Sequence, residues 1–494
     1  MKKVLIIGGG IGGLASAVQL AKEGFDVELF EKNENLGGRA NTFSEDGFRF
    51  DMGPSWYLMP DVFEKFFKSV GKNIEDYLSL QQLTPSYRVF FEDKTYYDIS
   101  TDIDELGDLF ESWEKGSKAK LKEFIQRSEE SYHIAMKDFV YKNYSSIFSF
   151  FNKKLLIEGS KLHVFENMDK YVSRFFKDKR IQQIMQYTLV FLGGSPKNTP
   201  ALYNIMSHID FNMGVWYPKG GMYEIPCALI KLAKEFGAKL HSNISVEKIC
   251  IDPGTKKASG IMLTNGTYVK GDVILSNGDY HFTETRLLPK KYQQYSETYW
   301  KKRTQSPSAF IIYLGLNKKL AKLQHHNLFF ASDWQKHFAE IFDQPEWPEN
   351  PSIYIGCPSK TDDTVAPHYG ENVFVLVPVA SGLEDDETIR TLYQSKIISM
   401  LEEWLGESIE NHVHIKKIFT VSDFKKKYNS HKGSALGLAH TLFQTAFFRP
   451  RNKSNKVHNL FYTGANTIPG IGVPMCLISS QLTSQQIKKY VRRN

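Results

Sequence analysis

The 494-residue sequence has few cysteines, no long apolar run and only a small excess of positive charge. Its four cysteines, at positions 227, 250, 357 and 476, form no C-x-x-C pair, so neither a metal knuckle nor a disulfide framework is expected, which fits a reducing cytoplasm. No run of about 18 apolar residues is present, so we expect no membrane-spanning helix. The net charge of +7 comes without a lysine-rich tail, which argues against a nucleic-acid partner.

The composition is that of a large folded protein with many aromatic rings. Hydrophobic residues make up 41% of the chain and aromatic residues 14%, with 35 Phe and 25 Tyr, which suits a binding cavity or a lipid-facing surface. The length allows one large domain with an insert, or two domains that share an interface. The first 20 residues imitate a signal peptide, but five glycines interrupt them, so we expect folded structure there.

A buried strand, a glycine-rich turn and a helix follow one another at the amino terminus. The apolar residues 4–7 are typical of a strand buried on both faces of a parallel sheet. Gly8, Gly10 and Gly13 occupy the G-x-G-x-x-G positions, and Gly12 lies in the same turn. The missing side chains allow a tight turn, close approach of a pyrophosphate and packing of the helix on the strand. The sequence therefore predicts a dinucleotide site at the start of this helix.

An acidic residue and a second pair of glycines follow the next predicted strand. Glu31 comes directly after the strand at 26–30, where a carboxylate accepts hydrogen bonds from ribose hydroxyls. Gly37, Gly38 and Arg39 follow, and this order resembles flavoproteins of the amine oxidase and carotenoid desaturase superfamily. The resemblance implies FAD rather than NAD as the cofactor, with Arg39 and its two glycines near the phosphates. An arginine suits that place because its planar fork donates several hydrogen bonds.

Further motifs are similar to the bacterial phytoene desaturase family along nearly the whole chain. In order they are Asp51-Met52-Gly53-Pro54-Ser55-Trp56, Gly193-Gly194-Ser195-Pro196 with Tyr203, Tyr217-Pro218-Lys219-Gly220-Gly221, Pro358-Ser359, Ala366-Pro367, and a last motif from Gly464 to Pro474. The resemblance implies cofactor contacts for Gly53, Pro54, Ser55, Val246, Gly464, Gly472, Val473 and Pro474. Ile468 departs from the pattern, because many relatives have a histidine there, so no proton-transfer role is carried over to that position.

The rest of the chain predicts how the domains are divided. We expect a discontinuous FAD-binding domain at 1–70, 215–290 and 416–494, and a substrate-binding and helical lid or membrane-contact region at 71–214 and 291–415. The sequence also predicts a hairpin over 87–99, a charged helix over 118–139 and a strand over 244–249. The expected fold class is α/β, a Rossmann-type FAD-binding domain with an inserted mixed α+β substrate domain and a helical region that can face a membrane.

Residues 141–180 have a composition suited to a membrane surface. They hold nine Lys and Arg against four Asp and Glu, interleaved with Phe, Tyr, Leu and Ile. Such a segment can rest on an anionic lipid interface without spanning it. The alternative is an ordinary helix pair that packs its aromatic rings in the core and leaves its lysines in water. An apolar substrate that is stored in membranes favours the first interpretation.

No catalytic residue and no metal ligand is predicted. Forming a C=C bond requires loss of a hydride and of a proton, and the flavin takes the hydride because no side chain can. An apolar tunnel that aligns the substrate is therefore expected in place of a charged catalytic cluster. His208, His431, His440 and the His325-His326 pair are expected to be structural or surface residues.

The function that the resemblance implies is desaturation of phytoene toward lycopene, with the reduced flavin reoxidised by a quinone or by oxygen. The enzyme would be cytoplasmic and peripherally associated with the inner face of the cell membrane. The alternatives within the family are a carotenoid 3,4-desaturase, a diapophytoene desaturase, a carotenoid isomerase and a ketolase. A more distant alternative is a non-catalytic binder of prenyl lipids, although the intact glycine motif, Glu31 and Arg39 argue against it.

Overall fold

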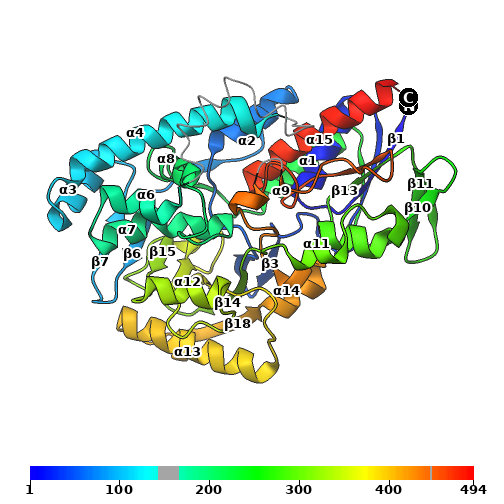
Figure 1. Cartoon of the computed structure of the whole chain (residues 1–494). Helices are drawn as coiled ribbons and strands as arrows, with labels where there is room; N and C mark the ends of the chain where they lie inside the picture. The colour runs from blue at the N-terminus through cyan, green and yellow to red at the C-terminus, as the bar shows by residue number, and fades with distance from the viewer. Residues whose placement is uncertain (143–165, 446–447, 494) are drawn as a thin grey trace.

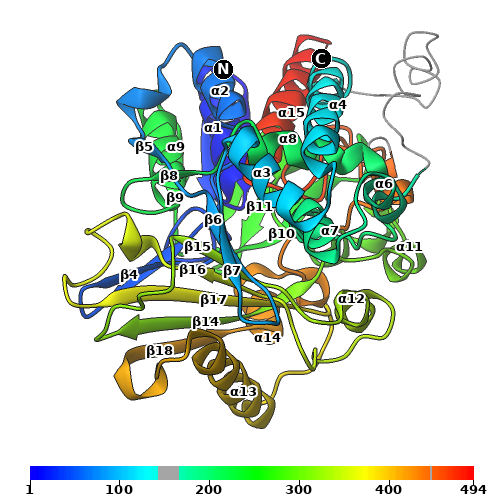
Figure 2. The same ribbon diagram turned by 90° about the vertical axis from the view of Figure 1, so that its left-hand side faces the viewer.

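The computed structural model describes residues 1–142, 166–445 and 448–493, and two large sheets organise it (Figures 1 and 2). One sheet contains the amino-terminal strand, and the other lies between one long helix and a group of helices. Among the described residues, none of the helices combines the length and the apolar character that crossing a membrane requires. The α/β fold class predicted from the sequence is confirmed.

The first sheet is parallel and has five strands. Its order is β19 (Leu460–Tyr462), β13 (Val273–Ser276), β1 (Lys3–Ile7), β2 (Asp26–Phe30) and β9 (Lys239–His241). Val4 and Ile6 pack into one hydrophobic cluster, whereas Leu5 and Ile7 pack into another on the opposite face. This burial on both faces explains why residues 4–7 form a continuous apolar run, as a central parallel strand requires.

Helices cover one face of this sheet and a small antiparallel sheet covers the other. The helices are α1 (Ile11–Lys22), α9 (Glu224–Glu235) and α15 (Val473–Arg493), whose apolar residues share one cluster with Val4 and Ile6. The small sheet consists of β10 (Val246–Asp252), β11 (Lys257–Leu263) and β12 (Tyr268–Lys270). The strand that the sequence predicts at 244–249 therefore begins two residues later and continues to Asp252.

The second sheet has seven strands. Its order is β18 (Val413–Phe419), β14 (Ser308–Leu316), β17 (Glu371–Val379), β16 (Ile353–Gly356), β15 (His326–Phe329), β6 (Tyr87–Phe90) and β7 (Tyr96–Ile99). β6 and β7 pair antiparallel, which confirms the hairpin predicted over 87–99. β18 spans residue 416, where the sequence places a domain boundary, so this boundary cuts through a strand.

Alternate residues of β14 face different layers. Phe310 and Ile312 pack with α13 (Glu387–Leu405), which both views place on the outer side of the sheet (Figures 1 and 2). Ala309 and Ile311 belong to the hydrophobic cluster on the opposite face. All nine residues of β14 are buried, because a strand in the middle of a sheet with both faces covered has no exposed side.

A group of helices closes the inner side of this sheet. They are α3 (Ile103–Trp113), α4 (Ser117–Ala135) with a π-helical turn at Met136–Val140, α6 (Met168–Phe175), α7 (Lys179–Gln186), the 3-10 helix η4 (Tyr187–Leu192) and α8 (Ile205–Phe211). The charged helix predicted over 118–139 is thus α4 with its π-helical end. Most of the segment 141–180, for which the sequence predicts a membrane surface, lies outside the described residues.

Shorter elements connect these layers. They are β3 (Thr42–Glu45), β4 (Phe48–Asp51), α2 (Pro60–Ser69), β5 (Leu80–Gln82), β8 (Trp216–Pro218), α10 (Tyr280–Phe282), α11 (Glu297–Lys301), α12 (Trp334–Phe342) and α14 (Val421–Tyr428).

Candidate active site

The glycine-rich turn between β1 and α1 packs against two distant segments of the chain. Gly8 has a φ of +95°, which favours glycine, and its N–H donates to the carbonyl of Phe30 at 2.8 Å. A Cβ added at Gly12 would lie 2.6 Å from Oδ1 of Asn277 and 3.1 Å from the backbone of Gly464. Three backbone segments therefore meet where only glycine fits, and the amino terminus of α1 stays open to an anion.

Gly13 has a different role from the other glycines of the motif. A Cβ at Gly13 would lie 2.2 Å from the carbonyl oxygen of Gly8, so this glycine lets α1 pack on the turn. It is absent from the cleft wall that the other motif glycines form. This arrangement matches the packing task that the third glycine has in dinucleotide-binding turns.

Glu31 follows the last residue of β2 and is buried, with 6% of its surface exposed. One carboxylate oxygen accepts a hydrogen bond from Gly9 N at 2.8 Å, and the other accepts from Asn33 N at 2.9 Å and Asn33 Nδ2 at 2.7 Å. These bonds fix the carboxylate at the edge of the cleft, where its remaining lone pairs can accept from ribose hydroxyls.

Arg39 lies where the cleft meets a larger cavity. Its Nη2 donates to Ser430 Oγ at 3.1 Å and to the carbonyl of Ser434 at 3.4 Å. Its Nε is buried and has no hydrogen-bond partner among the described residues. A buried N–H without an acceptor is costly, and a bound phosphate would supply that acceptor.

The cleft has a volume of about 230 Å³ and brings together most of the residues that the sequence predicts for the cofactor. Those in its wall are Gly8, Gly10, Gly12, Glu31, Gly37, Gly38, Arg39, Pro54, Val246, Gly464, Gly472 and Val473. Gly53, Ser55 and Pro474 line the adjoining cavity instead. The predicted set therefore divides between two connected spaces, and Gly13 lines neither of them.

Sequence reasoning missed several residues of the cleft wall. Asn277 follows β13, and a polar residue after a buried strand was a usable signal for it. Lys427, Tyr428 and Asn429 come from the end of α14 and the turn after it, far away in sequence. Lys427 Nζ lies 3.4 Å from Met52 Sδ, and burial lowers the pKa of this lysine. Nothing in the local sequence around α14 indicates that it closes the cleft.

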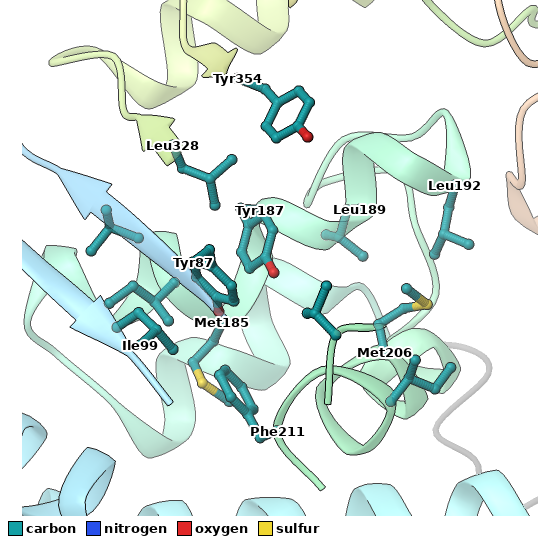
Figure 3. Close-up of a cluster of buried hydrophobic side chains, with 14 of the residues drawn as sticks. Tyr87, Ile99, Met185, Tyr187, Leu189, Leu192, Met206, Phe211, Leu328 and Tyr354 are labelled. Carbon is teal, nitrogen blue, oxygen red and sulfur yellow. The ribbon is translucent and has the colours of Figure 1, made fainter. Parts of the chain in front are cut away.

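The adjoining cavity has a volume of about 1160 Å³ and a wall that is almost entirely apolar. Five of its wall residues, Tyr187, Leu192, Met206, Leu328 and Tyr354, are labelled in Figure 3. None of its described wall residues is Asp, Glu or Lys, and Arg39 is the one permanently charged residue among them. Eight residues line both spaces, namely Arg39, Pro54, Tyr428, Ala435, Leu436, Ile471, Gly472 and Val473. A ligand in the cavity can therefore touch a cofactor in the cleft.

His440 forms a short polar network in this apolar wall. Its Nε2 accepts from Ile471 N at 3.0 Å, which leaves the proton on Nδ1, 2.5 Å from the Tyr203 hydroxyl. Tyr203 in turn donates to Thr445 Oγ1 at 2.8 Å. Burial, with a smaller effect of Arg449, holds the pKa of His440 well below its usual range. His440 is therefore a neutral residue that fixes the turn around Ile471.

The His325-His326 pair has ordinary structural partners on the Nδ1 atoms of both rings. His325 Nδ1 lies 2.6 Å from Thr361 Oγ1, and His326 Nδ1 lies 2.8 Å from the Tyr354 hydroxyl. Burial lowers the pKa of His325 to about 3. Over the part of the chain that the structure describes, no three His, Cys, Asp or Glu side chains are placed to hold a metal ion.

Comparison with known proteins finds relatives along almost the whole chain, and they agree with the flavoprotein family that the motifs resemble. Residues 11–488 match the family described as flavin containing amine oxidoreductase. A carotenoid 3,4-desaturase of Haloarcula japonica is 46% identical over 98% of this chain and 97% of that protein. A zeta-carotene-forming phytoene desaturase of Myxococcus xanthus is 35% identical over 98% of this chain and 94% of that protein. A diaponeurosporene-forming 4,4'-diapophytoene desaturase of Staphylococcus aureus is 34% identical, with 99% of both chains covered.

The solved structures support the fold. A crystal structure of an oxidoreductase from Methanosarcina mazei superimposes with a TM-score of 0.64 at 18% identity, covering 97% of this chain and 99% of that one. At this identity the likeness speaks for the fold alone.

Proposed function

This chain belongs to the carotenoid desaturases of the flavin-containing amine oxidoreductase family, with FAD as its cofactor, and we propose that it introduces double bonds into an acyclic carotenoid. The observation that carries the proposal is the apolar cavity of about 1160 Å³ that shares its wall with the cofactor cleft. Its volume exceeds that of most small-molecule sites, which suits a long hydrocarbon.

The cleft fits FAD by the chemistry of its wall. The amino terminus of α1 and Arg39 would hold the pyrophosphate, and the unpartnered Nε of Arg39 would gain an acceptor there. Glu31 would accept from the ribose hydroxyls. Bound FAD supplies a hydride acceptor, which no side chain can provide.

The cavity wall positions the substrate and keeps water out. Aromatic and aliphatic side chains gain from burying a polyene, at about 25 cal/mol per Å² of apolar surface. The surface that is shared with the cleft, at Pro54 and Ile471–Val473, is where a substrate bond can lie against the cofactor. Such alignment, together with the exclusion of water, is the main catalytic contribution that an apolar wall can make.

Within the family we favour 3,4-desaturation of an acyclic carotenoid over desaturation of phytoene toward lycopene. The support is the 46% identity with a 3,4-desaturase, compared with 35% for the phytoene desaturase relative. The motif around Met52 and Trp56 resembles phytoene desaturases and keeps that reaction as the second candidate. The two substrates differ in the length of their conjugated system, so a spectrum separates them.

The test is anaerobic mixing of the FAD-loaded protein with lycopene or with phytoene in liposomes. We expect flavin bleaching with lycopene, and an extracted pigment whose absorption bands lie at longer wavelength than those of lycopene. Flavin bleaching with phytoene but not with lycopene would support the second candidate, desaturation of phytoene. A flavin that stays oxidised with both carotenoids would contradict desaturation of these substrates, and a colourless protein that takes up no FAD would favour a prenyl-lipid binder.

We also propose that a quinone or oxygen reoxidises the flavin and that the protein works in the cytoplasm, at the inner face of the cell membrane. The support is the apolar substrate and the position of Phe443 and Phe448 in the cavity wall, with 67% and 39% of their surfaces exposed. Flotation with anionic liposomes tests the membrane contact. Replacing both phenylalanines by serine should reduce the bound fraction, and an unchanged fraction would contradict this surface.

A further inference from the structure

A buried carboxyl group lies beside the cavity, and no cation of the described residues pairs with it. Asp210 of α8 has 3% of its surface exposed. Its Oδ2 accepts hydrogen bonds from the hydroxyls of Tyr187 at 2.8 Å and Tyr87 at 2.9 Å. Its Oδ1 has no hydrogen-bond partner among the described residues. A carboxylate in an apolar environment that is compensated only by two phenols is costly, so the group needs an explanation.

The two tyrosines differ in their position relative to the cavity. Tyr187 lines the cavity, whereas Tyr87 lies behind it, although their rings are only 5.2 Å apart (Figure 3). Both rings pack near Trp56, at 6.1 Å and 5.4 Å between centroids. Trp56 follows the segment that contains Pro54, which lines both the cavity and the cofactor cleft. Tyr187 therefore connects the cavity wall with the Asp210 carboxyl.

Desaturation needs a proton acceptor, and no described residue of the cavity wall can serve as one without a partner outside the wall. None of its described wall residues is a carboxylate, and His440 is neutral with Nε2 already bonded to Ile471 N. We propose that Tyr187 and Asp210 form the proton acceptor of the reaction, an inference that rests on the proposed function. The carbon that loses the proton would lie against Tyr187.

The proposed step balances in protons and electrons. A hydride leaves one carbon for an oxidised flavin, which is the oxidant. The C–H electron pair of the neighbouring carbon forms the new C=C bond as its proton passes to the Tyr187 oxygen. The Tyr187 hydroxyl proton moves along its 2.8 Å hydrogen bond to the Asp210 carboxylate. Tyr187 thus ends neutral, and Asp210 holds the proton until it is released.

A second tyrosine of the cavity wall also donates a hydrogen bond to a carboxylate, but this tyrosine has other neighbours than Tyr187. Tyr132 lines the cavity and donates to Asp61 Oδ2 at 2.8 Å. The ring contacts of Tyr132 are with His133 and His208, whereas Tyr187 contacts Trp56, two residues after the Pro54 that lines both spaces. The position of Tyr187 favours the Asp210 pair.

The protonation of Asp210 suits this role. Burial raises the pKa of its carboxyl to about 7, partly offset by the two tyrosine hydrogen bonds. The titratable groups that face it are Tyr87 from β6 and Tyr187 from η4, whereas His133 of the neighbouring α4 contacts His208 instead. A group of this kind can both accept and release a proton near neutral pH.

The two tyrosines provide a matched pair of variants. Tyr187→Phe and Tyr87→Phe each remove one hydroxyl and one hydrogen bond to the same oxygen, but only Tyr187 lines the cavity. The measurement is the rate of flavin reduction in a single anaerobic turnover with lycopene, at several pH values, together with FAD content and carotenoid binding. We expect Tyr187→Phe to be slower by about 100-fold, within the range for general bases, and Tyr87→Phe by less than about 5-fold.

The pH profile separates catalysis from folding. In the unmodified protein the rate should fall below about pH 7, as the Asp210 carboxyl becomes protonated. Asp210→Asn should lose this dependence and keep FAD and carotenoid binding. If Asp210→Asn does not fold, the comparison of flavin reduction rates in Tyr187→Phe and Tyr87→Phe tests the proposal without it. Equal rates for Tyr187→Phe and Tyr87→Phe would overturn the proposal, whereas no flavin reduction by any carotenoid in the unmodified protein would instead contradict the proposed function.

Discussion

Replacing Glu31 by glutamine tests how this chain holds its cofactor. The Glu31 carboxylate accepts hydrogen bonds from Gly9 N and from two donors of Asn33, and it forms the edge of the cleft. An amide of the same shape turns one of the two acceptor oxygens into an NH₂ donor. Either Gly9 N–H or the Asn33 donors then face another donor, and the ribose loses a charged acceptor.

The size of the effect follows from the bonds that are lost. A hydrogen bond to a charged group contributes about 1.5–3 kcal/mol, and each 1.4 kcal/mol changes a dissociation constant tenfold. Loss of one such bond in the FAD complex therefore predicts a dissociation constant for FAD that is roughly 10- to 150-fold higher in Glu31→Gln.

The assay is titration of the apoprotein with FAD, followed by quenching of flavin fluorescence. Glu28→Gln is the control, because Glu28 lies on β2, the strand directly before Glu31 in the chain, and pairs with Lys3 at 2.8 Å but is absent from the cleft wall. We expect the control to bind FAD within about threefold of the unmodified protein, since Glu28 does not line the cleft that would hold the cofactor. Equal weakening by both variants, or an unchanged affinity in Glu31→Gln, would refute the assigned role of Glu31.

Three further predictions concern stability. Gly13→Ala would place a Cβ 2.2 Å from the Gly8 carbonyl oxygen. We therefore expect the free energy of unfolding in urea to fall by about 1–3 kcal/mol, and FAD to bind more weakly. An unchanged unfolding midpoint would show that α1 can move away from the turn. Arg449→Met would leave four backbone carbonyls without their donor, so we expect the free energy of unfolding in the same assay to fall by more than about 1 kcal/mol. A smaller loss would contradict a structural role for this buried arginine. The pKa of Asp210, raised by burial from 3.8 to about 7, means that the folded state binds the proton more tightly. Stability should therefore fall as pH rises from about 4 to 7, by up to roughly 4 kcal/mol, and calorimetry of Asp210→Asn should show a flatter dependence.

Local pattern was sufficient for the dinucleotide-binding part of the fold. The strands at 4–7 and 26–30, the glycine turn between them and Glu31 lie within 31 consecutive residues, so spacing alone predicts their geometry. The hairpin over 87–99 and the helix over 118–139 were predictable for the same reason, because their hydrophobic periods and turn residues are local.

The tertiary structure alone decided which distant residues complete the site. Lys427 and Tyr428 line the cleft because α14 follows the seven-stranded sheet, and no local pattern around α14 predicts that contact. His440 reaches Ile471, and Asp210 lies behind Tyr187, through contacts between segments that are tens of residues apart. The sequence by itself determined the elements and a dinucleotide site, because these depend on residue type and spacing, and the resemblance of its motifs to a known family implied FAD and an apolar substrate. The enclosed cavity and the acid beside it depend on how layers pack, since burial and charge compensation arise only between segments that folding brings together.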